Sequence, residues 1–359
     1  MTRILLWYWG RRGGGAQFSL SLARALAAGG VTLSVSRQNT LIDAFRSLPV
    51  PRQEVVTFNG IAGFVAGFTR IPVLAASLRR FAVEHATPVV LSSMSHPWTP
   101  FVARGLARAG VSFVPVIHDA APHPGDPAPL FGWRLARELS AARAAVVLSD
   151  VVADTIAARC PRLPLIRLPM GAHLPHGATT TIRRSDFLFF GRIRQYKGLD
   201  LLRDAWPTVL DAYPGATLRV VGHGNTDVCA PGLAALPGVS IEERWVPDAE
   251  MAEVVASAYT LVLPYREASQ SGVLPLALAS GVPVVATDVG GLAEQLRHGE
   301  SGILAQPTPS GLAMAMLRTL DAAERARLSR GAQQAGARLT DWTVQADLLR
   351  AGVARLLRV

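Results

Sequence analysis

Two basic side chains follow a short apolar run in the second half of the chain, where a strand would give way to a helix. The run Phe187–Phe190 ends at Gly191, and Arg192 and Lys197 stand before the next helical pattern. An arginine presents a planar fork to phosphate oxygens, and a lysine presents a compact point charge. The pair therefore predicts a phosphate-binding site. The alternative is a lysine on the surface of a helix start, which the macrodipole would mildly disfavour.

The use of lysine strengthens this prediction. Of the 36 basic residues, Lys197 is the only lysine, and the other 35 are arginines. Because every other basic residue is an arginine, the single lysine indicates that position 197 requires an ammonium group. The segment is not a Walker loop, because Gly198 follows the lysine where that motif has Ser or Thr.

A second polar segment follows the apolar run at 260–263. Glu267 and Gln270 are side chains that can hold sugar hydroxyls, and Ser271 precedes a helical pattern whose first N–H groups can hold a phosphate. The alternative is a capped strand-to-helix turn with no ligand. Because both polar segments follow strands, we expect them to meet at one edge of a sheet.

In the first half of the chain, a glycine-rich turn and a histidine each follow an apolar run, as the polar segments of the second half do. Gly13–Gly15 come between an apolar run and a helical pattern, which permits close approach of a ligand to the backbone. The turn lacks the G-x-G-x-x-G spacing, so dinucleotide binding is weakly supported, and a purely structural turn is the alternative. His118 ends another apolar run.

Other chemistries find little support. His118, Asp119 and His123 lie close in sequence, but their Pro-containing loop lacks the ligand spacing of a helix or hairpin, so we expect no metal. Cys160 and Cys229 are too isolated for a disulfide framework or a zinc site, which favours a reducing, cytoplasmic location. No G-x-S-x-G elbow is present, so hydrolase chemistry is not indicated.

The elements that must position these residues alternate along the chain. Apolar runs without strict alternation, separated by helical patterns, are typical of parallel sheets covered on both faces. Strands are expected at 3–8, 32–35, 88–91, 113–117, 145–148 and 165–168, and again at 187–190, 218–221, 239–241, 260–263, 282–286 and 302–304. Helices are expected at 16–28, 73–84, 97–109, 132–142 and 151–159, and again at 198–212, 249–257, 272–279, 292–297, 310–320, 322–338 and 342–357.

The repeated pattern predicts two doubly wound α/β domains in a chain of 359 residues. We expect an N-terminal domain over 1–170, a linker over 171–184, a C-terminal domain over 185–340, and a last helix, 341–359, that packs back toward the N-terminal domain. The carboxyl ends of the two sheets would face a central cleft.

The basic excess is confined to the first half of the chain. Residues 1–180 contain 18 basic and 8 acidic side chains, whereas residues 181–359 contain 18 of each. The segment 61–81 interleaves apolar and arginine side chains, which is compatible with a basic amphipathic surface on anionic lipid. A core-packed helix with solvated arginines is the alternative. Nucleic-acid binding is not expected, because the basic residues form no known module.

Taken together, the segments resemble the family 4 retaining glycosyltransferases of the GT-B fold. The matching stretches are GGGAQFSLSLARAL (13–26), VIHD (116–119), FFGRIRQYKGLDLL (189–202), VVGHG (220–224), VPDAEM (246–251) and SQSGVLPLALASGVPVVATDVGGLAEQL (269–296). The resemblance is most specific over 187–305 and looser over 30–110, where such enzymes meet varied acceptors.

The resemblance implies roles for particular residues. Arg192 and Lys197 would hold the donor diphosphate, and residues 271–274 would offer it backbone N–H groups. Val246 would lie near the nucleotide base, and His118 would contact the transferred sugar. The expected catalytic residues are His118, Arg192, Lys197 and Glu267. The expected donor-binding residues are Gly14, Gly15, Gly191, Gly222, Val246, Gln270, Ser271, Gly272, Val273 and Leu274.

One departure from the family pattern concerns its E-x7-E pair. When the family pattern is aligned without gaps at Gly281 and Pro283, the pair falls on Ala268 and Leu276. Neither residue is acidic. Glu267 lies one residue from the first position, so its assignment does not follow from the motif. A subset of the family with a similar Ser-Gln-Ser-Gly-Val block also lacks the pair, which favours a variant donor site over an inactive protein.

The expected activity is transfer of a hexose, with retention, from a nucleotide-diphosphate sugar to a glycan or polyprenyl-diphosphate-linked acceptor in cell-surface polysaccharide biosynthesis. No cofactor beyond this co-substrate is expected, and the N-terminal domain would contact the inner face of an anionic membrane. Two alternatives are a sugar-nucleotide epimerase of the same fold and a non-catalytic binding partner.

Overall fold

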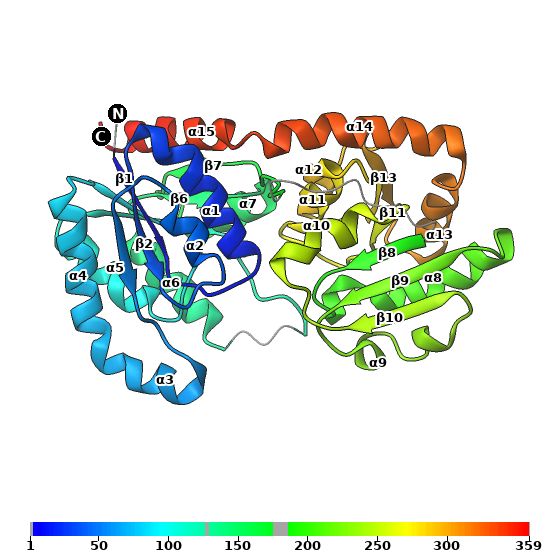
Figure 1. The fold of residues 1–359 in the computed structure, drawn as a ribbon, viewed down its shortest axis with the longest axis horizontal. Coiled ribbons are helices and arrows are strands. Elements are labelled where there is room, and N and C mark those ends of the chain that lie inside the picture. Colours follow the sequence, from blue (N-terminus) through cyan, green and yellow to red (C-terminus); the bar gives the residue numbers. More distant parts are fainter. Residues whose placement is uncertain (1–2, 126–128, 175–185, 359) are drawn as a thin grey trace. The chain divides into compact units, whose positions relative to one another are not determined.

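The computed structural model describes residues 3–125, 129–174 and 186–358, which form two compact units (Figure 1). The first unit contains residues 3–121, 129–169 and 342–358, and the second contains 122–125, 170–174 and 186–341. The division differs from the expected first domain, 1–170, in that residues 122–125 group with the second unit. Most of the expected linker, 171–184, lies outside the described residues.

The first unit is built on a seven-stranded parallel sheet. Its strand order is β3-β2-β1-β4-β5-β6-β7. The strands are β1 (Ile4–Tyr8), β2 (Val31–Ser36), β3 (Arg52–Val55), β4 (Val89–Ser92), β5 (Ser112–Ile117), β6 (Ala145–Val147) and β7 (Leu165–Arg167). Every residue of β1, β2 and β4 is buried, as a parallel sheet covered on both faces requires.

Helices connect these strands and cover the sheet. They are α1 (Gly14–Leu26), α2 (Ile42–Arg46), α3 (Gly60–Gly67), α4 (Ile71–Glu84), α5 (Thr99–Arg108), α6 (Phe131–Ala141) and α7 (Asp150–Arg159), with 3₁₀ turns η1 (Ala27–Gly29) and η2 (Phe68–Arg70). The last helix, α15 (Trp342–Leu356), packs on α1: Trp342 meets Phe18 edge-on at 5.4 Å between ring centroids, and Arg350 donates to the carbonyl of Leu26 at 3.3 Å.

The second unit has a six-stranded parallel sheet of order β10-β9-β8-β11-β12-β13. Its strands are β8 (Asp186–Phe190), β9 (Thr217–Gly222), β10 (Val239–Glu243), β11 (Thr260–Leu263), β12 (Val284–Thr287) and β13 (Gly302–Ala305). A buried ion pair joins the first two of these strands: the Nε of Arg219 lies 2.8 Å from Oδ2 of Asp186, and Arg219 also donates to Ser257.

The helices of the second unit lie on both faces of its sheet (Figure 1). They are α8 (Leu199–Ala212), α9 (Thr226–Cys229), α10 (Asp248–Ala256), α11 (Val273–Ala279), α12 (Gly291–Gln295), α13 (Pro309–Arg318) and α14 (Ala322–Thr340), with 3₁₀ turns η3 (Gln195–Lys197) and η4 (Leu233–Ala235). One apolar core includes Phe187, Phe189 and Trp206, all fully buried.

Both sheets have a topological switch point, where chain connections turn in opposite directions from neighbouring strands. In the first sheet this point lies between β1 and β4, and in the second between β8 and β11. Ligands of open α/β sheets bind outside the carboxyl ends of the strands at such points. The loops that follow these four strands are therefore the places to examine for a site.

The expected α/β architecture of two doubly wound domains is confirmed, but some elements were missed. The edge strand β3 and the short helices α2, α3 and α9 have no counterpart among the predicted elements. In β3 only Val55 is buried, because an edge strand has fewer neighbours to cover its side chains. Among the described residues, no helix combines the length and apolar character needed to span a bilayer.

Candidate functional site

Lys197 lies against two aromatic rings at the switch point of the second sheet. Its Nζ is 3.7 Å from the centroid of the Tyr265 ring and 4.8 Å from that of Tyr196. The lysine ends η3, after β8, whereas Tyr265 follows β11. An ammonium on the face of an aromatic ring is stabilised electrostatically, so the two rings fix the position of this cation.

The backbone brings the two loops together at Gly198. This residue has φ of 67°, a left-handed conformation that favours glycine, and a Cβ there would collide with the carbonyl oxygen of Pro264. The amide of Arg266 donates to the carbonyl of Tyr196 at 2.8 Å, which joins the same loops. The glycine after the lysine, which excludes a Walker loop, is therefore required by packing.

Arg192 and Ser271 lie at the polar ends of the same two tyrosines. The guanidinium of Arg192 donates to the Tyr196 hydroxyl at 3.4 Å, and the Tyr265 hydroxyl lies 3.4 Å from Oγ of Ser271. Burial raises the pKa of Tyr265 to about 12, although Ser271 and Arg192 both lower it. Tyr265 therefore remains a neutral phenol at physiological pH and connects the lysine to the serine loop.

Two glycines permit a close approach of the chain beside Arg192. A Cβ on Gly222, the last residue of β9, would collide with the carbonyl oxygen of Gly191. Gly191 itself has φ of 137°, and its amide donates to the carbonyl of Val221 at 3.1 Å. Gly191 and Gly222 were both predicted donor-binding residues, and in the structure they shape the loop that carries Arg192.

Glu267 has a partner that lies far from it in sequence. Its Oε1 is 2.7 Å from Nδ1 of His123, and the His123 ring stacks on Tyr196 with centroids 4.3 Å apart and planes at 14°. Nε2 of His123 lies 3.5 Å from Oγ of Ser269. The loop residues 122–125 thus join the second unit through a histidine that positions Glu267 beside the tyrosine cluster.

Gln295 holds the start of the serine loop. Its Oε1 accepts from the amide of Ser271 at 2.7 Å, and its Nε2 donates to the carbonyl of the same residue at 3.1 Å. The Ser271 N–H, which was expected to face a phosphate, is engaged by this side chain. Gly272 is exposed at the beginning of α11, followed by the half-buried Val273 and the buried Leu274. Gln270 is half-buried beside them.

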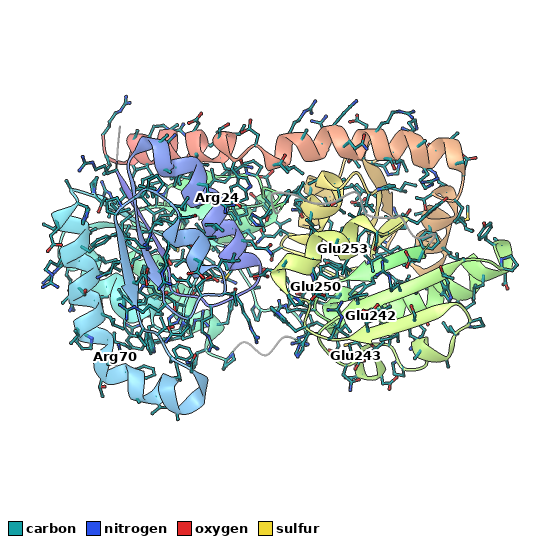
Figure 2. The ribbon with its side chains drawn as sticks, in the orientation of Figure 1. Arg24, Arg70, Glu242, Glu243, Glu250 and Glu253 are labelled. Carbon is teal, nitrogen blue, oxygen red and sulfur yellow. The ribbon has the colours of Figure 1, made fainter. Side chains whose placement is uncertain are left out.

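Val246 is buried in the core of the second unit, on the loop from β10 to α10. The adjacent Trp245 is exposed and meets His223 with ring centroids 6.4 Å apart. Glutamates flank this loop, two on β10 and two on α10 (Figure 2). They are Glu242, Glu243, Glu250 and Glu253. Arg244 forms ion pairs with Glu242 and Glu250, so two of these four carboxylates are neutralised beside the Trp245 ring.

The glycine turn of the first unit lies at the switch point of its sheet. Gly13 precedes α1 with φ of 79°, and a Cβ on Gly15 would come within 2.6 Å of Sδ of Met94, in the loop after β4. Nothing lies within 4 Å of the position that a Cβ on Gly14 would occupy. Gly15 therefore packs against the β4 loop, while Gly14 borders open space.

His118 follows β5 and is half-buried. Its Nε2 donates to the carbonyl of Ser93 at 2.9 Å, and its ring meets Phe18 edge-on at 5.4 Å between centroids. Burial lowers the pKa of His118, although Ser93 and Asp119 oppose this effect. The histidine is therefore held neutral and in one orientation.

The structure brings Arg192, Lys197, Glu267 and Ser271 into one cluster of the second unit. His118, Gly14 and Gly15 belong to the first unit. Sequence reasoning missed Tyr196, Tyr265 and His123 as parts of the cluster. The two tyrosines lie within the segments that were singled out, so their position was the available signal. Within the described ranges, no three His, Cys, Asp or Glu side chains form a metal-ligand group, and the expected absence of a metal remains a prediction.

Comparisons with known proteins include a family match over the part of the chain that carries the cluster. A family model described as Glycosyl transferases group 1 matches residues 184–322. A D-inositol 3-phosphate glycosyltransferase from Segniliparus rotundus is 33% identical over 178 residues, covering 47% of this chain and 40% of that protein. A phosphatidyl-myo-inositol mannosyltransferase from Mycobacterium tuberculosis is 35% identical over 132 residues, covering 36% of this chain and 35% of that protein. The matches thus span about two fifths of these relatives.

A solved structure extends the likeness to the whole fold. Anabaena Alr3699/HepE, in complex with UDP and glucose, superposes with a TM-score of 0.72 at 15% identity, covering 99% of this chain and 100% of that chain. At this identity the likeness shows the fold alone. The fold and the site define a GT-B type protein of two Rossmann-like domains. The sequence matches confirm the resemblance to the family 4 glycosyltransferases.

Proposed function

We propose that this protein is a retaining glycosyltransferase that uses a nucleotide-diphosphate sugar. The observation that carries the proposal is the placement of Lys197 on the faces of Tyr196 and Tyr265, at the switch point of the sheet that matches the glycosyltransferase model. Arg192 lies on the same tyrosine cluster. Two cations at the carboxyl edge of a doubly wound sheet suit a diphosphate.

The chemical task proposed for these cations is to stabilise the leaving group. Negative charge develops on the diphosphate as the bond to the sugar breaks, and fixed cations need no reorganisation at that moment. Two rings fix the position of Lys197, and its ammonium is proposed to contact phosphate oxygens of the donor. Arg192 would supply a second, planar contact. His118, held neutral, is proposed to contact the transferred sugar.

Retention of configuration is proposed to occur by departure and attack on the same face of the sugar. A double displacement would need a carboxylate nucleophile and a second carboxyl group. Glu267 is paired with His123, and the second position of the family's acidic pair is the buried Leu276. This arrangement favours a front-face route that depends on the diphosphate-binding cations, with no metal ion.

The substrate class is proposed from the relatives. Two of them are named for transfer to an inositol-containing acceptor, and the structural neighbour was solved with UDP and glucose. We therefore infer that a hexose is transferred to an acceptor that carries a polyol or glycan, in cell-surface polysaccharide biosynthesis. A lipid-linked acceptor at the cytoplasmic face of a membrane is the favoured form.

The lipid proposal is supported by a line of exposed aromatic side chains on the first unit. Phe68, Phe101 and Trp133 are 40%, 42% and 39% exposed, and successive ring centroids lie 5.6 and 5.7 Å apart. Arg70, which Figure 2 labels, ends η2 two residues after Phe68. Exposed aromatic rings with neighbouring arginines suit the interface of an anionic membrane. We call Phe68, Phe101 and Trp133 the aromatic line.

A donor panel tests the proposal. The full chain is incubated with UDP-, GDP- and TDP-hexoses, first alone and then with polyprenyl-diphosphate-linked glycans and inositol phosphates. We expect slow hydrolysis of one donor, faster release of its nucleotide diphosphate with one acceptor, and an α-linked product from an α-linked donor. A product of inverted configuration would contradict retention.

The same panel separates the rival functions. An epimerase would convert the donor sugar without an acceptor and would leave an epimerised sugar on the nucleotide or free in solution. A non-catalytic binding partner would bind a nucleotide sugar, as measured by calorimetry, without consuming it. Either result would overturn the proposed transfer.

A further inference from the structure

The first unit contains a small cavity next to His118. Its volume is about 180 Å³, and it lies at the carboxyl ends of β4 and β5, covered by α6. The loop after β4 contributes Met94 and Ser95, and the end of β5 contributes His118 and Asp119. The volume corresponds to about six water molecules at roughly 30 Å³ each, which is comparable with one sugar-sized ring.

Three polar side chains form a connected group in the wall of this cavity. Glu138 on α6 is only 2% exposed, and its Oε1 accepts a hydrogen bond from Oγ of Ser95 at 2.5 Å. Arg134, one turn earlier on α6, donates to the same Oγ at 2.8 Å. Ser95 thus connects a buried carboxyl group to a guanidinium group, and all three side chains line the cavity.

One hydrogen-bond donor in this group of three side chains is not satisfied within the group. Nε of Arg134 is buried, and within the described residues it has no hydrogen-bond partner. A buried donor without a partner costs free energy unless a ligand or water completes it. Arg134 and Glu138 both line the cavity, so a carboxyl group that accepts and a guanidinium group that donates form a complementary pair of contacts for a hydroxyl group.

The charges around Glu138 define the chemistry of a ligand. Arg134 and Ser95 face the carboxyl group directly, and His118 and Asp119 line the same cavity from the β5 loop. The neighbouring helix α5 directs its charged residues, Arg104 and Arg108, to solvent. Burial raises the pKa of Glu138 to about 7, so the carboxyl group is ionised above neutral pH.

We propose that Ser95, Arg134 and Glu138 form a specificity subsite that binds a neutral hydroxyl-bearing ring of the acceptor, a sugar or a cyclitol. One ring hydroxyl donates to the carboxylate of Glu138, and a neighbouring ring oxygen accepts from Arg134. This inference rests on the proposed transferase function and extends it to the acceptor. A phosphate or carboxylate in the same place would be repelled by ionised Glu138.

Binding of simple ring polyols tests this subsite independently of turnover. Saturation-transfer NMR titrations with myo-inositol, methyl α-mannoside and methyl α-glucoside are run on the full chain at pH 6 and pH 8. We expect at least one probe to bind more tightly at pH 8, because the ionised carboxylate is the stronger acceptor. The variant Glu138→Gln keeps the size of the side chain and should weaken binding at pH 8 by about tenfold.

Controls separate this proposal from the proposed function. The exposed Glu84 on α4 provides a matched control, and Glu84→Gln should bind the probes like the parent protein. UDP binding should be unchanged in Glu138→Gln, whereas failure of the parent protein to bind any nucleotide would contradict the transferase assignment alone. Tighter binding of inorganic phosphate at pH 6 than at pH 8, without polyol binding, would overturn the subsite in favour of an anion site. Equal polyol binding by the parent protein and Glu138→Gln would also overturn it.

Discussion

At the level of single residues, Lys197 contacts the faces of Tyr196 and Tyr265, and its ammonium group is the lone lysine charge of the chain. We expect Lys197→Met to lower the rate of donor cleavage by about 10² to 10³, the range for removal of one fixed charge-stabilising group. The fold should survive, because methionine can occupy the same space between the rings. Initial rates of nucleotide release and the thermal midpoint of unfolding measure the two effects.

The exposed Arg330 on α14 supplies a control for loss of one positive charge from the second unit. Arg330→Met should retain the parent rate. Lys197→Arg should recover only part of the activity, because a planar guanidinium does not fit where a compact ammonium lies between two rings. Parent-like turnover in Lys197→Met would contradict the role assigned to this residue.

Glu138 gives a prediction about stability and pH. Its pKa is raised from 4.5 to about 7 by burial, so the folded chain binds this proton more tightly than the unfolded chain does. The resulting stabilisation is complete below pH 4.5 and is lost as the pH rises through 7. Glu138→Gln removes the cost of an ionised buried group, so we expect it to gain up to about 3 kcal/mol in unfolding free energy between pH 5 and pH 8, relative to the parent.

Urea unfolding at the two pH values measures this difference. The exposed Glu84→Gln variant should show the same pH dependence as the parent protein. If Glu138→Gln and the parent changed in parallel from pH 5 to pH 8, the carboxyl group would not be the titrating group that the structure indicates.

The residues of the site divide into those visible in the sequence and those that only the fold reveals. Arg192 and Lys197 stood out in the sequence, because the helix macrodipole disfavours basic residues before a helix start, and their donor-binding role stays a prediction. His123 was not predictable as the partner of Glu267, since 144 positions separate them and only the fold brings them within 2.7 Å. Ser95 and Glu138 have no local motif, because their importance arises from burial.

At the level of elements, the loop after β8 depends on the close approach of Gly222 to Gly191. A methyl group at position 222 would collide with the carbonyl oxygen of Gly191 and displace the loop that carries Arg192. We expect Gly222→Ala to weaken UDP binding by tenfold or more, since a small misplacement of a binding loop has large effects. It should also cost about 1 to 3 kcal/mol of stability. Calorimetry with UDP and denaturant unfolding measure the two quantities.

Gly215, on the turn between α8 and β9, provides the matched control. A Cβ there would meet its nearest neighbour, the Tyr213 ring, at an ordinary distance of 3.7 Å. Gly215→Ala should therefore bind UDP like the parent protein. Unchanged UDP binding in Gly222→Ala would show that this contact does not position the donor site.

The buried central strands could be predicted from the sequence, whereas the exposed edge strand β3 could not. The central strands are continuous apolar runs, because both faces of a parallel sheet are covered, and this made them recognisable. The edge strand β3 has the sequence Arg-Gln-Glu-Val, which contains no apolar run. Glu54 of this strand forms ion pairs with Arg46 and with Arg52 of the same strand, so the charged residues reflect the strand's position at the edge of the sheet.

At the level of the whole molecule, the structure makes the charge asymmetry larger than the sequence halves indicate. Because α15 belongs to the first unit, the described residues of that unit carry 21 arginines and 8 acidic side chains, a net charge of +13. The described residues of the second unit carry 13 basic and 17 acidic side chains, a net charge of −4. A positive unit attracts anionic surfaces within about a Debye length, and the negative unit does not.

The positive charge of the first unit and its aromatic line together predict binding to anionic membranes. We expect the protein to float with vesicles that contain phosphatidylglycerol at low salt, and to dissociate as salt screens the arginines. The double variant Phe68→Ser, Phe101→Ser should reduce the bound fraction by about tenfold at intermediate salt, since each ring would transfer roughly half of its surface from water to the interface. Tyr213, an exposed aromatic residue of the second unit, supplies the control, and Tyr213→Ser should float like the parent protein. Absence of flotation at low salt would contradict membrane contact, whereas flotation that the double variant retains would assign it to the arginines alone.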